Sequence, residues 1–109
     1  MITLEDFDKI DMRVGTIVEV GINKRARKPA YKLKIDMGSE LGIKNSSAQI
    51  TDLYKIEDLI GKQVVVVTNF SPIRIADVKS EVRILGADSP VGVVLLDLER
   101  PVDNGAKIY

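Results

Sequence analysis

The densest group of chemically active side chains is a basic segment at residues 23–34. It holds six cations and no acidic residue, namely Lys24, Arg25, Arg27, Lys28, Lys32 and Lys34. Cations in such a run can neutralise phosphates, and each phosphate contact makes binding more sensitive to salt. A solvated loop between two strands is the other interpretation of the same run. The sequence therefore offers Lys24, Arg25, Arg27 and Lys28 as candidate anion-binding residues.

A second candidate surface extends over residues 69–86. It follows an apolar run, turns at a Ser-Pro pair, and places Arg74 and Lys79 among apolar residues, with Ser80 at its edge. Phe70 could stack on a base or line an apolar pocket, although a place in the core is the favoured interpretation of that ring taken alone. We predict that Arg74 and Lys79 are exposed and that this region is the working surface of the protein.

Small polar side chains form a third candidate at Ser47 and Gln49. Hydroxyl and amide groups on a strand can hydrogen-bond a base edge or a peptide backbone. Contact with water is the favoured interpretation of these residues when they are considered alone.

The composition excludes most enzyme mechanisms. The chain has no cysteine and no histidine, so it lacks a thiolate nucleophile, the commonest general base and the commonest transition-metal ligands. Its carboxylates form no recognisable metal or acid–base motif, and no phosphate-binding glycine loop or serine-hydrolase motif is present. We therefore predict a non-enzymatic binding protein with no catalytic residue, no metal and no cofactor.

Charge and aromatic content restrict the ligand. Sixteen basic and sixteen acidic residues give a formal net charge of zero, and aromatic residues make up 5% of the chain. Nucleic-acid binders are usually basic, and base stacking requires aromatic rings. A groove that stacks several bases in a row is therefore not expected.

The first residues and the apolar runs predict where the protein resides. Residues 1–10 include three acids and lack the basic and apolar regions of a signal peptide. The apolar runs at 64–67 and 91–96 are far too short to cross a bilayer. We expect a cytoplasmic protein that does not insert into membranes.

The hydrophobic pattern predicts the elements that must position these side chains. Helical spacing predicts a short helix capped by Thr3 and a second helix over residues 51–60 that ends at Gly61. Alternation predicts strands at residues 11–22 and 31–37, and a β-branched run predicts one at 63–70. A returning strand at 43–50 and further short strands at 82–85, 91–96 and 106–108 are also expected. The length of 109 residues fits one domain, 1–109.

This order of elements predicts an all-β fold. The expected architecture is a five-stranded OB-fold Greek-key barrel with one helix between strands 3 and 4 and short terminal extensions. Another small β-barrel or an α+β sandwich would also fit the pattern.

Four local features are also expected. Gly15 suggests a bulge or a sharp curl within the first strand. Residues 38–42 read as a hairpin turn. Leu4, Phe7 and Ile10 form an apolar stripe on the first helix. One face of the first strand is expected to be largely buried and consists of Met12, Val14, Thr16, Val18 and Val20.

Three ordered motifs resemble one family over nearly the whole chain. Residues 11–17 read DMRVGTI and resemble the D-[IL]-R-V-G-x-I opening of the tRNA-binding OB domains, which occur in some aminoacyl-tRNA synthetases and as free-standing dimers. Residues 46–50 match their S-x-x-Q-I strand. Residues 69–75, followed by 79–82, resemble their N-[LF]-x-P-x-[KR]-[ILM]-x-G-x-x-S block. The runs 43–51 and 101–105 follow the CsaA-type secretion chaperone branch of that family.

The resemblance implies a homodimeric CsaA-like chaperone that dimerises through its terminal segments and binds unfolded or precursor polypeptides in protein export. Carried over by position, the binding residues would be Asn69, Phe70, Arg74, Lys79, Ser80 and Gln49. Two acids depart from the synthetase-type pattern, Asp77 and Glu81, and they favour a polypeptide ligand. We expect apolar, positively charged peptides to bind.

Two other functions stay open at this point. One is a free-standing tRNA-binding protein that recognises tRNA shape through phosphates, which would make tRNA a partner. The other is a β-barrel adaptor that recruits another protein and binds neither ligand. The export machinery is a further partner that the resemblance leaves open.

Overall fold

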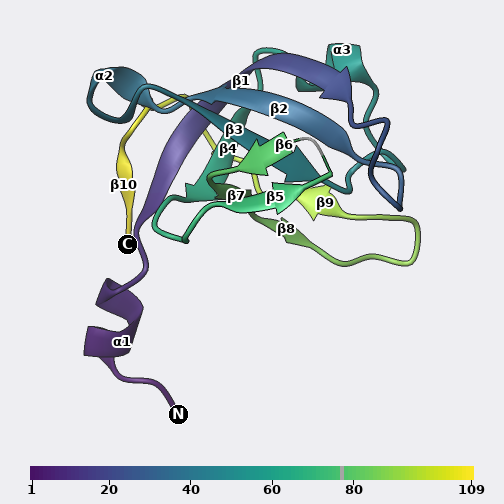
Figure 1. The fold of residues 1–109 in the computed structure, drawn as a ribbon. Helices are drawn as coiled ribbons and strands as arrows, with labels where there is room; N and C mark the ends of the chain where they lie inside the picture. The colour runs from purple at the N-terminus through teal and green to yellow at the C-terminus, as the bar shows by residue number, and fades with distance from the viewer. Residues whose placement is uncertain (77) are drawn as a thin grey trace.

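The computed structural model describes residues 1–76 and 78–109, and most of them form a small β-barrel (Figure 1). The main sheet has the strand order β3-β2-β1-β4-β7, and β10 also pairs with β1. Two separate hairpins, β5–β6 and β8–β9, lie beside it. The elements are α1 (Leu4–Asp8), β1 (Met12–Ile22), β2 (Tyr31–Asp36), α2 (Gly38–Leu41), β3 (Ile43–Ala48), α3 (Ile56–Leu59), β4 (Gln63–Val67), β5 (Ile73–Ile75), β6 (Val78–Ser80), β7 (Arg83–Ile84), β8 (Gly86–Ala87), β9 (Val94–Leu95) and β10 (Lys107–Ile108). The predicted all-β barrel of the OB type is confirmed.

The barrel is closed between β3 and the segment that joins β6 to β7. The backbone N–H of Glu81 donates to the carbonyl of Asn45 at 2.9 Å. The buried hydroxyl of Ser46 donates to the carbonyl of Val82 at 2.7 Å. These bonds satisfy backbone groups that an open sheet edge would leave unpaired.

The core fills the barrel with aliphatic side chains. Ile17 of β1, Ile35 of β2 and Val64 of β4 have no exposed surface, and Leu59 of α3 joins them from one end. Helix α3 lies between β3 and β4 as predicted, but only one turn of the expected 51–60 helix forms. The carbonyl of Tyr54 accepts a hydrogen bond from the Tyr31 hydroxyl at 2.8 Å, so tertiary contacts hold this part of the segment outside a helix.

The expected buried face of β1 was right in part, because Val14 is buried and Val20 packs against the core, whereas Val18 is exposed. Gly15 and Ile17 face the core, and the β1–β2 register shifts between Ile17 and Glu19. The bulge therefore lies beyond Gly15, and Val18 is 44% exposed. Val14 is buried on the other face, because the chain at Gly105 and Ala106 bonds to its backbone.

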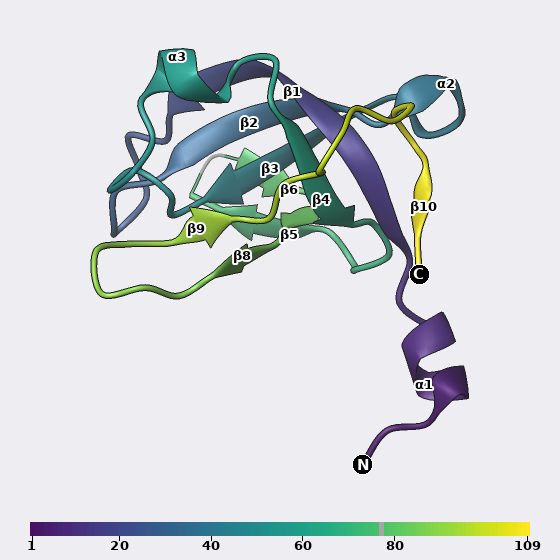
Figure 2. The same cartoon turned by 180° about the vertical axis from the view of Figure 1, so that it is seen from behind.

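The N-terminal helix projects away from the barrel (Figures 1 and 2). Its predicted cap is confirmed, because the Thr3 hydroxyl accepts from the Asp6 N–H while the Asp6 carboxylate accepts from the Thr3 N–H. No residue of α1 is buried, and Leu4 is 83% exposed. Among the described residues, Leu4 and Ile10 of the apolar stripe are thus exposed, whereas Phe7 is partly buried.

Two connections differ from the sequence-based expectation. Residues 38–41 form the helical turn α2 where a simple hairpin turn was predicted, and the Met37 N–H closes it by donating to the Gly42 carbonyl. The segment after β4 was predicted as a turn but contains the β5–β6 hairpin.

None of the helices among the described residues is long and apolar enough to cross a membrane.

A polar cluster fixes the junction between α1 and the barrel. The Asp11 carboxylate accepts hydrogen bonds from the Thr68 hydroxyl and from Arg13 Nε, the latter at 2.9 Å. Arg13 also donates to the Gly105 carbonyl at 3.1 Å. The Thr68 hydroxyl first, and Arg13 second, hold the pKa of Asp11 below its ordinary value. The cluster ties the start of β1 to the end of β4 and to the C-terminal segment.

This lowered pKa gives a prediction for acid stability. A carboxyl whose pKa is depressed in the folded state stabilises the protein above its unfolded-state pKa, and this stability is lost as the pH falls through the folded-state pKa. We expect Asp11→Asn to lower the denaturant midpoint at neutral pH, and the difference from wild type to shrink below about pH 4. Urea unfolding at a series of pH values measures this. A difference that stays constant down to pH 2 would contradict the role of the Asp11 charge.

Candidate binding groove

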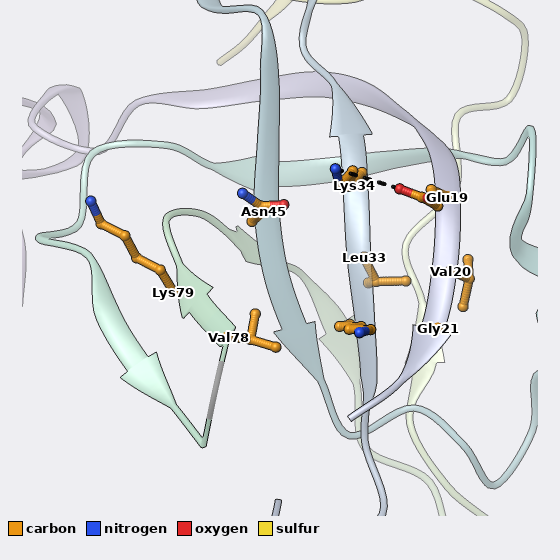
Figure 3. Close-up of a pocket in the computed structure, with 9 residues that line it drawn as sticks. Glu19, Val20, Gly21, Leu33, Lys34, Asn45, Val78 and Lys79 are labelled. Carbon is orange, nitrogen blue, oxygen red and sulfur yellow. Dashed lines mark ion pairs between the residues drawn. The ribbon is translucent and has the colours of Figure 1, made fainter. Parts of the chain in front are cut away.

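An open groove lies on the outside of the barrel, where β1, β2, β3 and β6 come together (Figure 3). Its volume is about 480 Å³. We call it the groove, and its lining residues are Glu19, Val20, Gly21, Lys32, Leu33, Lys34, Asn45, Val78 and Lys79. The lining combines aliphatic side chains with three lysines, one acid and one amide.

The alternation of β2 places two of these lysines. Tyr31, Leu33 and Ile35 are buried, so Lys32 and Lys34 emerge on the outer face of the same strand. Lys32 pairs in register with Gly21 of β1. A Cβ at Gly21 would lie 2.9 Å from Lys32 Cε, so the bare glycine leaves room for the lysine stem to lie across β1.

The charge of the groove is positive but mixed. Lys34 Nζ lies 3.6 Å from the Glu19 carboxylate, and both side chains are more than half exposed. Among residues 1–76 and 78–109, Lys32 and Lys79 lie within 4.0 Å of no carboxylate. An exposed ion pair such as Glu19–Lys34 contributes little to stability, so these charges are available to a ligand.

The β5–β6 hairpin brings part of the second candidate surface to the groove. Arg74 and Lys79 pair across the hairpin and are both exposed, as predicted. Ser80 is half-buried, and its hydroxyl accepts from the Ser47 N–H at 3.4 Å. Ser47 pairs in register with Lys32, so Ser47 and Ser80 lie where β3 meets the hairpin beside the groove.

The remaining predicted residues are more dispersed. Lys24, Arg25, Arg27 and Lys28 are exposed in the loop between β1 and β2. Gln49 is exposed just after β3. None of these side chains lines the groove.

Asn69 and Phe70 lie elsewhere on the barrel. The Asn69 side chain accepts from the Asp11 N–H at 3.0 Å and donates to the Lys9 carbonyl at 2.7 Å. Asp11 precedes β1, whereas the groove residues Glu19 to Gly21 lie near the far end of this 11-residue strand. Phe70 is 55% exposed, so the favoured interpretation of this ring as a core residue was wrong.

The sequence placed Lys32 and Lys34 in a basic segment but did not assign Glu19, Asn45 or Val78 to a site. Asn45 is held by Glu81, whose carboxylate accepts from the Asn45 N–H at 3.1 Å and from its side-chain amide at 3.2 Å. Glu81 was expected to alter the ligand preference, but its carboxylate bonds to β3 instead. Asp77, the other acidic departure, lies outside the described residues. The strand alternation was the available signal for the two lysines.

The arrangement supports reversible binding of an extended or charged ligand. Tyr31 points into the core, and its hydroxyl is bonded to the carbonyl of Tyr54, so this strand offers no ring for stacking at the groove. The fold and the external groove define a ligand-binding module on an OB-type barrel. The chain belongs to the family described as "Putative tRNA binding domain", whose model matches residues 12–107.

Solved structures of known proteins are similar to the whole chain. The CsaA chaperone protein from Picrophilus torridus is 53% identical, with a TM-score of 0.96 and complete coverage of both chains. The chaperone CsaA from Bacillus anthracis is 50% identical, with a TM-score of 0.93, and the match covers 100% of this chain and 99% of that one.

A curated relative is much longer. The methionine–tRNA ligase of Methanococcus vannielii is 37% identical over 109 residues, which are 100% of this chain and 16% of the ligase. The chain therefore spans about a sixth of the length of that relative.

Proposed function

We propose that this protein is a non-catalytic, CsaA-like chaperone that holds unfolded or precursor polypeptides in the groove. The observation that supports this most directly is the lining of the groove. Val20 supplies a partly exposed aliphatic side chain, Leu33 and Val78 border the groove but are almost wholly buried, and the amide of Asn45 can bond to a peptide backbone. The likeness to two CsaA chaperones over the whole chain points in the same direction.

The charge of the groove changes the expected peptide preference. Among the residues that the structure describes, three lysines and one glutamate line it. Charge complementarity therefore favours apolar segments that carry acidic residues over those that carry basic ones. We replace the expectation of positively charged clients with this preference.

A second function, tRNA binding, rests on a different observation. The family description and the ligase relative concern tRNA, and four exposed cations lie in the loop between β1 and β2. Binding through phosphates needs cations and no stacking ring, which agrees with the absence of an aromatic residue among the groove lining. The two ligands would compete if both use the groove.

The proposal is tested with two probes. Fluorescence anisotropy measures binding of an unfolded apolar peptide that carries glutamates and of a matched peptide that carries lysines. We expect tighter binding of the acidic peptide, and binding of neither would overturn the chaperone function. Filter binding of total tRNA in a salt series measures the alternative: retention that weakens as salt rises supports it, and no retention at low salt excludes it.

We further propose that the protein is a homodimer in which α1 contributes to the interface. A helix as short as α1 is marginal in water by itself, because most helical stability comes from packing of an apolar face. Met1, Ile2 and Leu4 are all more than 70% exposed at this end of the chain. A second copy of the chain is the occupant that would cover this surface. Cytoplasmic location and contact with an export machinery stay predictions.

Light scattering at micromolar concentration tests the dimer. We expect a mass of twice 12.0 kDa for the wild type. Leu4→Gln/Ile10→Gln should give the mass of a single chain, because it removes apolar surface and leaves the Thr3–Asp6 cap intact. The matched control Glu5→Gln/Asp8→Asn changes exposed polar residues of the same helix and should stay dimeric. A wild-type monomer would refute the dimer, and a dimeric Leu4→Gln/Ile10→Gln variant would refute the role of α1.

A further inference from the structure

Asn23 is the first residue after β1, and its side chain is buried at the junction of three parts of the fold. It is 3% exposed. Its Nδ2 donates to the Ser47 hydroxyl of β3 and to the Ile75 carbonyl of β5, both at 3.2 Å. Its backbone N–H donates to the Ala30 carbonyl at 2.9 Å, which closes the base of the basic loop. One residue therefore links the loop, β3 and the β5–β6 hairpin.

The buried amide of Asn23 costs free energy that an apolar side chain of similar size would not. Burying an amide is unfavourable unless it is hydrogen-bonded, and the Asn23 Oδ1 accepts no hydrogen bond from the described residues. An apolar side chain would fill the position without that cost. The amide instead provides directional hydrogen bonds, whose two donors fix the positions of the hairpin and β3 relative to the loop.

The hairpin is a part of the fold that needs such fixing. Ala76, next to Ile75, has a φ of 57°, which non-glycine residues adopt at a cost of about 1–2 kcal/mol. A strained backbone persists only when its surroundings hold it. The bond from Asn23 to the Ile75 carbonyl supplies one such restraint beside the strained residue.

We propose that Asn23 is a positioning residue that holds the basic loop and the β5–β6 hairpin at a fixed separation beside the groove. Lys79 and Val78 enter the groove from the hairpin, and the loop carries four exposed cations. The hydrogen bonds of the amide therefore set the distance between the loop and the groove, and this distance determines whether both can contact one ligand. The consequence for affinity rests on the proposed function, whereas the geometric claim does not.

The geometric claim is tested by a distance measurement without ligand. The chain has no cysteine, so spin labels can be attached at Arg27→Cys in the loop and Arg74→Cys in the hairpin, both at exposed positions. With the labelled protein diluted into an excess of unlabelled wild type, so that a dimer carries one pair of labels, we expect one narrow distance distribution in the labelled parent and a broader one after Asn23→Ala. The matched control is Asn104→Ala, which also removes carboxamide hydrogen bonds, to Thr16 and Gln63, but away from the groove. Its distribution should equal that of the parent, and an unchanged distribution in Asn23→Ala would overturn the proposal.

Ser47→Ala keeps the test decisive if Asn23→Ala does not fold. It removes one of the two acceptors of Asn23 and should give an intermediate broadening. An unchanged distribution in this variant, with Asn23→Ala unfolded, would overturn the positioning role.

Affinity gives a second readout, with the glutamate-bearing peptide and tRNA as probes. We expect Asn23→Ala to weaken binding about tenfold, and Asn104→Ala to leave it unchanged. The loss caused by Lys24→Gln/Arg25→Gln should be smaller in the Asn23→Ala background, because the loop is no longer held in place. An equal loss in both backgrounds would overturn the coupling. If the unlabelled wild-type protein binds neither probe while the label distances differ as expected, the proposed function fails and the positioning role stands.

Discussion

Replacing Gly15 with alanine is expected to destabilise the protein by about 2–3 kcal/mol, and valine by more. A Cβ at this position would lie 2.5 Å from Met37 Sδ and 2.6 Å from Ile35 Cγ2. Both neighbours have no exposed surface, so neither can move aside without disturbing the core. Because a domain of this size has a total stability of about 5–15 kcal/mol, Gly15→Val should leave a large unfolded fraction at moderate temperature.

The same strand offers a matched control. Gly21 also lies on β1, and the three atoms nearest to a Cβ there all belong to the Lys32 side chain, with Cε at 2.9 Å and Cγ at 3.4 Å. This chain is flexible and exposed, so Gly21→Ala should change stability by less than about 0.5 kcal/mol. Urea unfolding of both variants at neutral pH gives the two values. Equal destabilisation would mean that general loss of glycine, and not the close approach of β2, explains the effect.

The contrast between these glycines shows what the sequence could predict about the fold. Alternation of apolar and polar residues located β1 and β2, the glycine-flanked turn placed the returning strand β3, and the β-branched run located β4. It did not locate the bulge, because both faces of β1 carry aliphatic side chains. Gly15 was read as a bulge, but the structure assigns it to close packing against Ile35 and Met37. Which of these roles a mid-strand glycine has depends on the neighbouring strand, and that strand is distant in sequence.

Long-range contacts also explain the other differences. The 51–60 segment has helical spacing, but the bond from Tyr31 to Tyr54 holds its middle outside a helix. The β5–β6 hairpin was missed because a Ser-Pro pair and two cations hide the alternation of its short strands. Its place against β3 depends on bonds between residues 33 to 36 positions apart, such as Ser47–Ser80 and Asn45–Glu81. Local patterns contain no information about such pairs.

The candidate site was predictable to a similar extent. The cations were found by composition, and the exposure of Arg74 and Lys79 followed from their charge, because unpaired charged side chains are rarely buried. The meeting of Lys32, Lys34 and Lys79 in one groove required the β2–β3–β6 arrangement. Asn69 belongs to the family motif, yet its amide joins the start of β1 to the end of β4. A motif residue can thus be retained for the barrel itself, and the binding role of Asn69 stays a prediction.

Reversing two groove charges should weaken ligand binding more than any other surface change. Lys32→Glu/Lys79→Glu alters the charge of the lining by four units and turns a net positive groove negative. Exposed charge pairs are worth about 0.2–1 kcal/mol each, and every reversal both removes an attraction and adds a repulsion. We therefore expect affinity for the glutamate-bearing peptide and for tRNA to fall about tenfold to a hundredfold at low salt.

The effect of the total net charge on binding must be distinguished from the effect of charges located in the groove. Lys9→Glu/Lys107→Glu makes the same change in net charge with two exposed residues at the Met12 end of β1, opposite the groove. This control should keep most of the affinity, provided that light scattering shows the same oligomeric mass for both variants. Equal losses would mean that the whole surface attracts the ligand and that the groove has no special part. A selective loss with the groove variant that disappears at high salt would locate recognition at Lys32 and Lys79. Salt screens the interactions of exposed charges, and the screening length shortens from about 10 Å at 0.1 M to about 3 Å at 1 M.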